Sequence, residues 1–171
     1  MFPYCPQCKS AKINFDSQRY WVCSDCDFVY FHNTAAGVAA IIRYENELLF
    51  TVRAKEPGKG KLDLPGGFVD YHESLEQGLS RELEEELGLI IQPSQWRYFC
   101  SFPNQYLYKK INYQTIDSVF ICHLTEKPKL NLEAHEISDV NWLDIEHVKC
   151  SEMAFQSLAK AVENFIQDIN T

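Results

Sequence analysis

The 171-residue sequence lacks an apolar run long enough to cross a membrane. A transmembrane helix needs about 18 or more consecutive apolar residues, whereas the longest run here, residues 35–42, is far shorter and contains a glycine. The N-terminus shows neither the basic nor the apolar region of a secretory signal peptide. We therefore expect a cytoplasmic protein that does not associate with membranes.

Basic residues are also fewer than acidic residues. Sixteen Lys and Arg residues stand against 24 Asp and Glu residues, which gives a net charge of −8. This balance argues against nucleic acid or an anionic membrane as the main partner. The hydrophobic content of 46% excludes a disordered, collagen-like or low-complexity chain. The length predicts one domain, with room for a small additional module.

Seven cysteines are an odd number, which does not suit a framework made of disulfides alone. Four of them form two Cys-x-x-Cys pairs separated by 14 residues: Cys5, Cys8, Cys23 and Cys26. Two such pairs can complete a tetrahedral site of four thiolates, the arrangement of structural zinc sites. A redox role for a single pair is the alternative. We predict a zinc ribbon over residues 1–34, stabilised by its Zn²⁺ because so short a segment buries little core.

The remainder, residues 35–171, alternates strand and helix patterns. Strands are expected at 37–44, 48–53, 62–64, 95–102, 114–124 and 140–143, and an aromatic loop at 103–112. A helix is expected at 73–87, ended by Gly88. A second helix, with Ser151 as its N-cap, is expected at the C-terminal end, with an apolar face packed on the sheet.

Most of the negative charge is concentrated in one stretch. Residues 67–89 contain seven acidic residues and one basic residue, Arg81, so this segment carries −6 of the net charge. On a helix of about 3.6 residues per turn, Glu82, Glu85 and Glu86 share one edge, beside a stripe of leucines. Like charges at this spacing destabilise a helix. Divalent cations would remove the repulsion, and oxygen ligands suit Mg²⁺ or Mn²⁺.

A solvated acidic face is the simpler alternative. Three features favour a site instead. Gly78 lies one turn before Glu82 and suggests that another group approaches closely. Arg81 can orient a carboxylate. Gly66 and Gly67 precede the helix and allow backbone groups to come near a ligand.

Together these residues resemble the Nudix hydrolase family. The family pattern is Gly, five residues, Glu, seven residues, then Arg-Glu-aliphatic-x-Glu-Glu-x-Gly-aliphatic. Each specified position is matched here by Gly67, Glu73, Arg81, Glu82, Leu83, Glu85, Glu86, Gly88 and Leu89. His72, which is not a specified position, stands where many members have Gly.

The resemblance implies an α/β fold, an α/β/α sandwich around a mixed sheet. It also implies an enzyme, a hydrolase that cleaves the pyrophosphate of a nucleoside diphosphate linked to another group X. By the same resemblance, Glu82, Glu85, Glu86 and the Gly67 carbonyl would bind Mg²⁺ or Mn²⁺. Arg81 and Glu73 would hold the helix and the loop in place.

The family's catalytic base lies either in this motif, at Glu85 or Glu86, or in a loop before the last helix. Glu136 and Glu133 are the loop candidates, and Glu136 has the more typical spacing. Arg53, at the end of a predicted strand, is a candidate phosphate contact or a surface residue. Phe102 and Tyr106 are candidates to contact the base of a small-molecule nucleotide substrate, or they cover the sheet edge.

A zinc ribbon before a Nudix domain is similar to the NADH pyrophosphatase group. The chain departs from that group's downstream Ser-Gln-Pro-Trp motif, since residues 101–108 read SFPNQYLY. ADP-ribose, NAD(H), a related compound or a nucleotide-capped RNA end therefore remain open as substrates. The alternative function is a ligand-sensing binding module that uses the ribbon for contact with a partner or with nucleic acid. The ribbon's neutral charge argues against the latter contact. The oligomeric state is left open, with a homodimer as one option.

Overall fold

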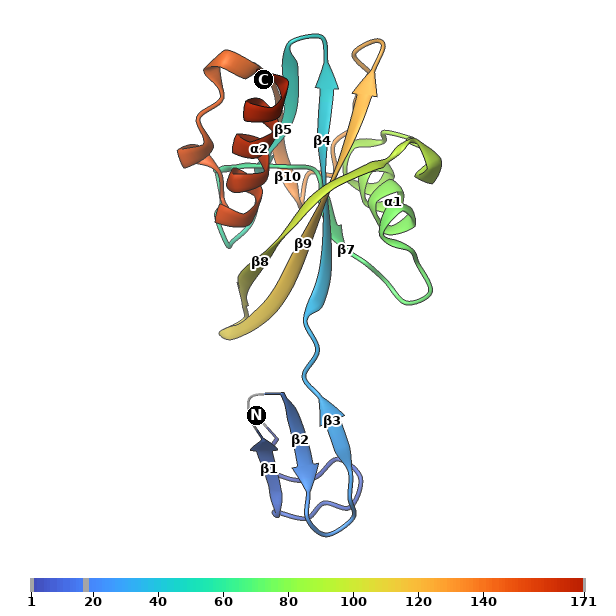
Figure 1. The fold of residues 1–171 in the computed structure, drawn as a ribbon, viewed down its shortest axis with the longest axis vertical. Helices are drawn as coiled ribbons and strands as arrows, with labels where there is room; N and C mark the ends of the chain where they lie inside the picture. Colours follow the sequence, from blue (N-terminus) through green and yellow to red (C-terminus); the bar gives the residue numbers. More distant parts are fainter. Residues whose placement is uncertain (1, 17–18, 171) are drawn as a thin grey trace. The chain divides into compact units, whose positions relative to one another are not determined.

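The computed structural model describes residues 2–16 and 19–170. The chain divides into two compact units, Met1–Thr34 and Ala35–Thr171. Each unit has its own sheet and core (Figure 1). Neither α1 nor α2, nor any other helix in the described part, has the length and apolar character to cross a membrane.

The smaller unit is a three-stranded antiparallel sheet in the order β1-β2-β3. Its strands are β1 (Ile13–Asp16), β2 (Tyr20–Cys23) and β3 (Val29–Phe31). The buried residues of its core are Cys5, Ile13 and Cys23. Aromatic rings supply much of the remaining contact, for example Phe15 stacked on Trp21 at 4.8 Å between ring centroids. So small a core contributes little stability, which makes the cysteines central to this unit.

The larger unit has a seven-stranded sheet with the order β10-β5-β4-β9-β8, with β6 paired to β5 and β7 paired to β4. The strands are β4 (Ala35–Tyr44), β5 (Glu47–Arg53), β6 (Leu62–Asp63), β7 (Gly66–Phe68), β8 (Arg97–Tyr108), β9 (Ile111–Leu124) and β10 (Ile137–Asp144). The β4–β9 pair is parallel, whereas the other pairs are antiparallel. The sheet is therefore mixed.

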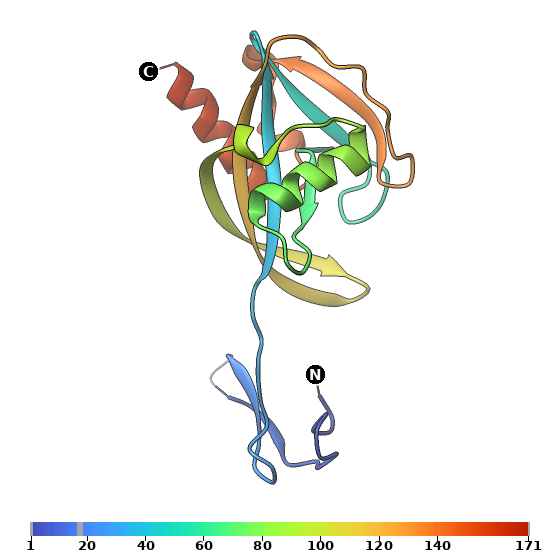
Figure 2. The ribbon, with the colours of Figure 1, turned by 90° about the vertical axis from the view of Figure 1, so that its right-hand side faces the viewer.

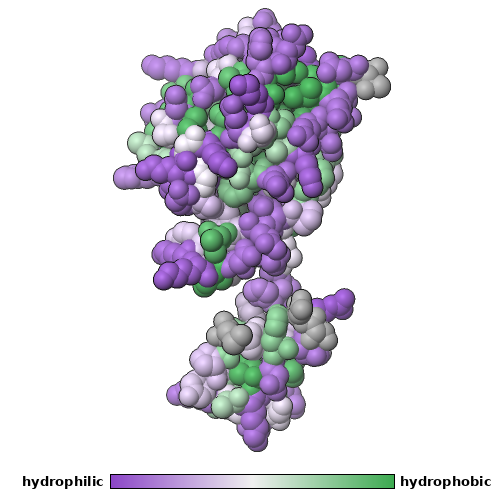
Figure 3. Space-filling view, turned by 90° about the vertical axis from the view of Figure 1, so that its left-hand side faces the viewer, coloured by the Kyte–Doolittle hydropathy of each residue, from purple (hydrophilic) through white to green (hydrophobic). Residues whose placement is uncertain are grey.

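Two helices cover opposite faces of this sheet, α1 (Leu75–Leu87) and α2 (Gln156–Ile169) (Figures 1 and 2). Side chains of strand β4 contribute to the core on both faces of the sheet, because successive side chains of a strand point to opposite sides. Val38, Ala40 and Ile42 join the core beneath α1. Ala39 and Ile41 join the core beneath α2. This layered arrangement confirms the predicted α/β/α sandwich. Hydrophilic side chains dominate the face seen in Figure 3, with apolar side chains between them.

The predicted aromatic loop at 103–112 is wrong. These residues continue β8 and β9 as a long hairpin that turns at Lys109 and Lys110, which have φ of 46° and 68°. Aromatic and β-branched residues favour strands. Pro103 is tolerated because β8 is an edge strand.

The predicted N-cap at Ser151 is also wrong, since α2 begins at Gln156 after a short 3-10 turn, Cys150–Glu152. The chain between them is held extended because the Ala154 N–H donates to the Leu62 carbonyl at 2.8 Å.

Candidate active site

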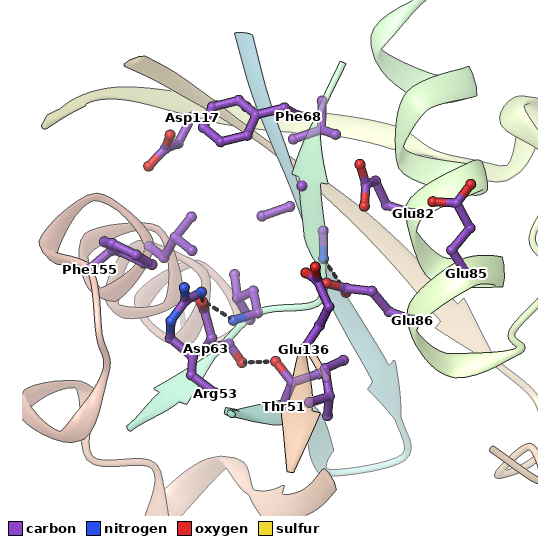
Figure 4. A pocket seen from close by; sticks show the side chains of 18 of the residues that line it. Thr51, Arg53, Asp63, Phe68, Glu82, Glu85, Glu86, Asp117, Glu136 and Phe155 are labelled. Atoms are coloured by element: carbon purple, nitrogen blue, oxygen red, sulfur yellow. Dashed lines mark hydrogen bonds and ion pairs between the residues drawn. The ribbon is translucent and has the colours of Figure 1, made fainter. Parts of the chain in front are cut away.

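A cavity of about 620 Å³ lies on the larger unit between α1 and the beginning of α2. Among the described residues that line it are eight carboxylates and only three cationic side chains, Arg53, Lys55 and Arg81. Most of the predicted site residues line this cavity: Arg53, Gly67, Arg81, Glu82, Glu85, Glu86, Tyr106 and Glu136. Four of the acids, Glu82, Glu85, Glu86 and Glu136, lie at one end, where α1 and the Glu136 loop meet (Figure 4). A cavity with this charge attracts cations.

Helix α1 presents three of the acids on a rigid support. Ser74 caps its N-terminus, accepting a hydrogen bond from the Gln77 N–H at 3.2 Å, while the Gln77 side chain accepts one from the Ser74 N–H. Leu79, Leu83 and Leu87 are fully buried against the sheet. The helix therefore cannot rotate without exposing its leucines, and its glutamates keep their edge toward the cavity.

Two glycines let the backbone of β7 come close to its neighbours. A Cβ on Gly66 would lie 2.1 Å from the Val38 carbonyl oxygen of β4, and this residue has φ of +148°. A Cβ on Gly67 would lie 2.4 to 2.6 Å from the Glu82 carboxylate atoms. The Gly67 backbone therefore lies directly against the Glu82 carboxylate, which would have to move to admit a side chain at this position.

Arg81 connects the loop after β7 to the acidic edge of α1. Its guanidinium donates to both carboxylate oxygens of Glu73, at 2.8 and 3.1 Å, and to the Phe68 carbonyl at 3.0 Å. It also donates to Glu82 at 2.9 Å and to Glu85 at 3.1 Å. The hydrogen bonds from Arg81 lower the pKa of Glu73. A planar, bidentate contact of this kind fixes the loop against the helix.

The acids that face the cavity are destabilised in their ionised form. Burial raises the pKa of Glu86 to about 8, and repulsion from Glu82 and Glu136 adds to the effect, against one hydrogen bond from the Gly66 N–H at 3.2 Å. Burial likewise raises the pKa of Glu82, although Arg81 opposes it. Glu85 lies nearer the solvent, with 60% of its side chain exposed. A divalent cation would relieve the repulsion among these groups.

The carboxylates are not gathered around a single point. Glu82 and Glu85 turn toward Arg81, and Glu86 turns toward the Gly66 N–H. Their chemistry nevertheless fits a hard dication, since several crowded carboxylate oxygens and a nearby backbone are what Mg²⁺ and Mn²⁺ use.

The two loop candidates for the base have different surroundings. Glu133 accepts hydrogen bonds from the backbone N–H groups of His135 and Glu136, both at 2.9 Å, so it braces its own loop. Glu136 forms an ion pair with Lys55 and keeps 46% of its side chain exposed. It lies beside Glu86 at the acidic end of the cavity (Figure 4).

Of the three residues predicted to contact the substrate, two line the cavity and one does not. Arg53 lines the cavity but is engaged with Asp63 at 2.6 Å and with the Pro57 carbonyl at 2.6 Å, and its guanidinium lies 4.9 Å from the Phe155 ring centre. Tyr106 lines the cavity, with its ring 5.6 Å from that of Phe68. Phe102 instead packs against the core beneath α2. Glu73 acts through Arg81 and is not among the lining residues.

Three residues that sequence reasoning missed are prominent in the cavity. Phe68 and Phe155 add aromatic walls, and Asp117 adds a carboxylate from the middle of β9. The available signal for Asp117 was that it is the one acidic residue of β9, since Asp is depleted in strands. Phe155 occupies the N-cap position of α2.

A second candidate metal site lies in the smaller unit. Within residues 2–16 and 19–170, four cysteines form the one group of ligating side chains whose ligand atoms lie within 4.8 Å of one another: Cys5, Cys8, Cys23 and Cys26. The sulfurs of Cys5 and Cys26 are 3.7 Å apart, as are those of Cys8 and Cys23. Four Zn–S bonds of about 2.3 Å in a tetrahedron require sulfurs about 3.8 Å apart. The cluster therefore fits Zn²⁺.

Comparison with known proteins gives consistent results for family and fold. Residues 32–166 match the NUDIX domain. A crystal structure of a NUDIX hydrolase from Nitrosomonas europaea superimposes with a TM-score of 0.70 at 21% identity, covering 98% of this chain and 92% of that one. That likeness shows the fold.

Two relatives carry names that describe a reaction. NAD-capped RNA hydrolase NudC of Photobacterium profundum is 29% identical over 139 residues, which is 81% of this chain and 48% of the relative. ADP-ribose pyrophosphatase of Methanocaldococcus jannaschii is 44% identical over 62 residues, which is 36% of either chain. The chain thus spans about half the length, or less, of these relatives.

Proposed function

The chain belongs to the NUDIX family, and on that premise we propose that it is a divalent-metal-dependent hydrolase that cleaves the pyrophosphate of a nucleoside diphosphate linked to a group X. One observation carries the proposal. Three acids of α1, the Glu136 loop and the backbone of Gly67 meet at one end of a single cavity. This end can hold cations, and the other end has aromatic walls that can hold a base.

In this proposal Glu82, Glu85 and Glu86 hold Mg²⁺ or Mn²⁺, with the Gly67 carbonyl beside Glu82. When bound, these ions neutralise the pyrophosphate and increase the acidity of the attacking water. Arg81 is a positioning residue, because its contacts with Glu73 and the Phe68 carbonyl set the distance between β7 and α1. The raised pKa of Glu86 shows how strongly this end disfavours uncompensated negative charge.

We assign proton removal from the attacking water to Glu136. Its carboxylate faces the acidic end of the cavity and is held by one exposed partner, Lys55, so it can turn toward a water molecule. Glu133, in contrast, is committed to two backbone hydrogen bonds. A general base must lie within reach of the proton that it removes.

The substrates that fit are small nucleotides such as ADP-ribose or NAD(H), and the name of one relative, ADP-ribose pyrophosphatase, agrees with that class. The name of the other, NAD-capped RNA hydrolase, supports a nucleotide-capped RNA end as a further candidate. A ligand-sensing module is the alternative function. Every acid of the motif is present, which supports hydrolysis over sensing, because binding alone does not need the full set. The Zn²⁺ held by the four cysteines has a structural role in this proposal.

The test uses purified protein with Mg²⁺ or Mn²⁺ and a panel of ADP-ribose, NADH, NAD, diadenosine polyphosphates and nucleoside triphosphates. Glu85→Gln and Glu86→Gln should each reduce turnover by about a hundredfold or more, the scale of losing a proton-transfer or metal-binding group. Glu84→Gln is the matched control, since Glu84 is exposed on the same helix away from the cavity. Wild-type rates in the Glu85 and Glu86 variants would contradict the proposed mechanism.

A further inference from the structure

A notch in the sheet lies at the end of the cavity away from the metal-binding glutamates. Gly37 of β4 is paired with Phe68 of β7 on one side and with Asp117 of β9 on the other. Paired residues of neighbouring strands present their side chains on the same face. Gly37 has no side chain of its own in this row, and the Asp117 carboxylate leans over it, since a Cβ on Gly37 would lie 3.0 Å from the Asp117 Oδ1. The notch is therefore the part of the cavity wall at Gly37 that is bordered by Phe68 and by the Asp117 carboxylate, both labelled in Figure 4.

Aromatic side chains from three elements border this notch. The Tyr106 ring of β8 lies 5.6 Å from the Phe68 ring and 5.9 Å from the Phe155 ring, centre to centre. Phe155 is itself covered by the Arg53 guanidinium at 4.9 Å. Flat aromatic walls of this kind suit the stacking of a nucleobase or the apolar face of a sugar.

The Asp117 carboxylate is held in place by two hydroxyl groups. The Ser157 hydroxyl of α2 donates to its Oδ2 at 2.5 Å, and the Thr115 hydroxyl donates to its Oδ1 at 3.1 Å. Both hydroxyl-bearing residues are buried. A carboxylate has about four acceptor positions, so two remain for a ligand. Neutral donors orient the carboxylate without cancelling its charge.

The negative charge near the Gly37 notch determines which chemical group of a ligand can bind there. Asp117 lies close enough to Asp63 for repulsion to contribute to the raised pKa of Asp63, whose main cause is burial. An anionic phosphate is therefore disfavoured here. A neutral group with hydrogen-bond donors is favoured, because ionised acceptors form the stronger hydrogen bonds.

We propose that Asp117 is a specificity-determining residue that accepts two neighbouring hydrogen bonds from the nucleoside part of the substrate, held in the Gly37 notch beside the aromatic rings of Phe68, Tyr106 and Phe155. This rests on the proposed function, since it names the nucleoside end of the same substrate. Two groups have this chemistry: the cis-diol of a ribose, and the neighbouring imino and amino groups of guanine. The adenine base does not offer two neighbouring donors, because an acceptor nitrogen stands beside its amino group.

The experiment measures binding of nucleoside monophosphates by calorimetry in Mg²⁺ buffer. These compounds contain no pyrophosphate bond, so the result does not depend on hydrolysis. The pair AMP and 2′-deoxy-AMP tests the diol, and the pair GMP and IMP tests the guanine edge. We expect wild-type protein to separate the members of one pair by about tenfold or more, the scale of one hydrogen bond to a charged group.

Asp117→Asn should reduce that separation to less than about twofold, because the amide nitrogen replaces one acceptor with a donor. Asp70→Asn is the matched control: it makes the same charge change at an exposed acid lining the same cavity, and it should keep the separation. Ser157→Ala keeps the carboxylate but removes the hydroxyl that orients it, so it should give an intermediate separation. This variant also keeps the proposal testable if Asp117→Asn does not fold.

The proposal is overturned if none of the four compounds binds at millimolar concentration, if neither pair is separated, or if the separation persists in Asp117→Asn. It is also overturned if Asp70→Asn removes the separation equally. Failure of the proposed hydrolase activity has a different signature: no member of the substrate panel is cleaved, while the Asp117-dependent separation is still observed.

Discussion

Replacing Glu86 with Gln should make the protein more stable in the absence of magnesium and manganese while it removes activity. The cause is the burial that raises the pKa of Glu86 to about 8, from an ordinary value of 4.5. The folded state therefore holds a proton that the unfolded state has released between these two pH values. Stability of the wild-type protein falls as pH rises through this window, because the unfolded state binds fewer protons.

The size of the effect follows from these two values. A tenfold change in proton affinity is worth about 1.4 kcal/mol, so the wild-type protein loses roughly 3 kcal/mol by pH 7 and roughly 5 kcal/mol above pH 8 as upper bounds. Glutamine carries no charge and can still accept the hydrogen bond from the Gly66 N–H. Glu86→Gln should therefore be little different from wild type at pH 4 and clearly more stable at pH 9.

The assay is urea unfolding of both proteins at pH 4, 7 and 9, with zinc retained and magnesium and manganese removed. The tryptophan fluorescence of the larger unit reports its transition, since Trp96 is buried against α1 with its indole N–H donating to Ser80 at 2.9 Å. Saturating Mg²⁺ should restore wild-type stability more than that of the variant. Equal stability of the two proteins at pH 9, or a less stable variant, would refute the assignment of charge repulsion to this end of the cavity.

Three further changes test other parts of the structure. Changing Cys5 and Cys8 to Ser should lower the zinc content to background, which atomic emission measures, and should lower the melting temperature of the smaller unit, which calorimetry measures. Turnover should remain nearly unchanged. Gly67→Ala should reduce kcat by about a hundredfold, because its Cβ would lie 2.4 Å from the Glu82 carboxyl carbon and displace it; steady-state rates decide. Arg81→Lys should cost about 2 kcal/mol of unfolding free energy, since an ammonium cannot reproduce the bidentate contact; urea unfolding with an unchanged midpoint would contradict this.

The sequence predicted the local elements better than their extent. The helix at 73–87 was found at Leu75–Leu87, because its leucine spacing and the C-cap at Gly88, with φ of 63°, are local signals. The outer part of the β8–β9 hairpin, residues 103–112, was interpreted as a loop, because its turn is made of two lysines instead of the glycine or asparagine that usually marks one. Its length depends on cross-strand pairing, which no local pattern encodes.

For the candidate site, too, the sequence predicted residues that are close together in the chain and missed residues that come from distant segments. The acids of α1 lie next to one another in the sequence, and Gly78 was expected to mark a close approach; Glu73 and Val69 lie within 3.1 to 3.3 Å of a Cβ placed there. Asp117 and Phe155 could not be assigned, because they reach the cavity from β9 and the start of α2 only after the sheet has formed. Side-chain contacts between distant segments require the tertiary structure.

Strand β4 has a consequence for the order of events during synthesis. Its parallel partner is β9, and paired residues such as Val38 and Ser118 are 80 residues apart in the chain. The ribosome must therefore deliver most of the larger unit before this central ladder can close, and such non-local pairing slows folding. The smaller unit needs only its first 34 residues. We expect it to bind zinc and fold on the nascent chain before β4 of the larger unit can pair with β9.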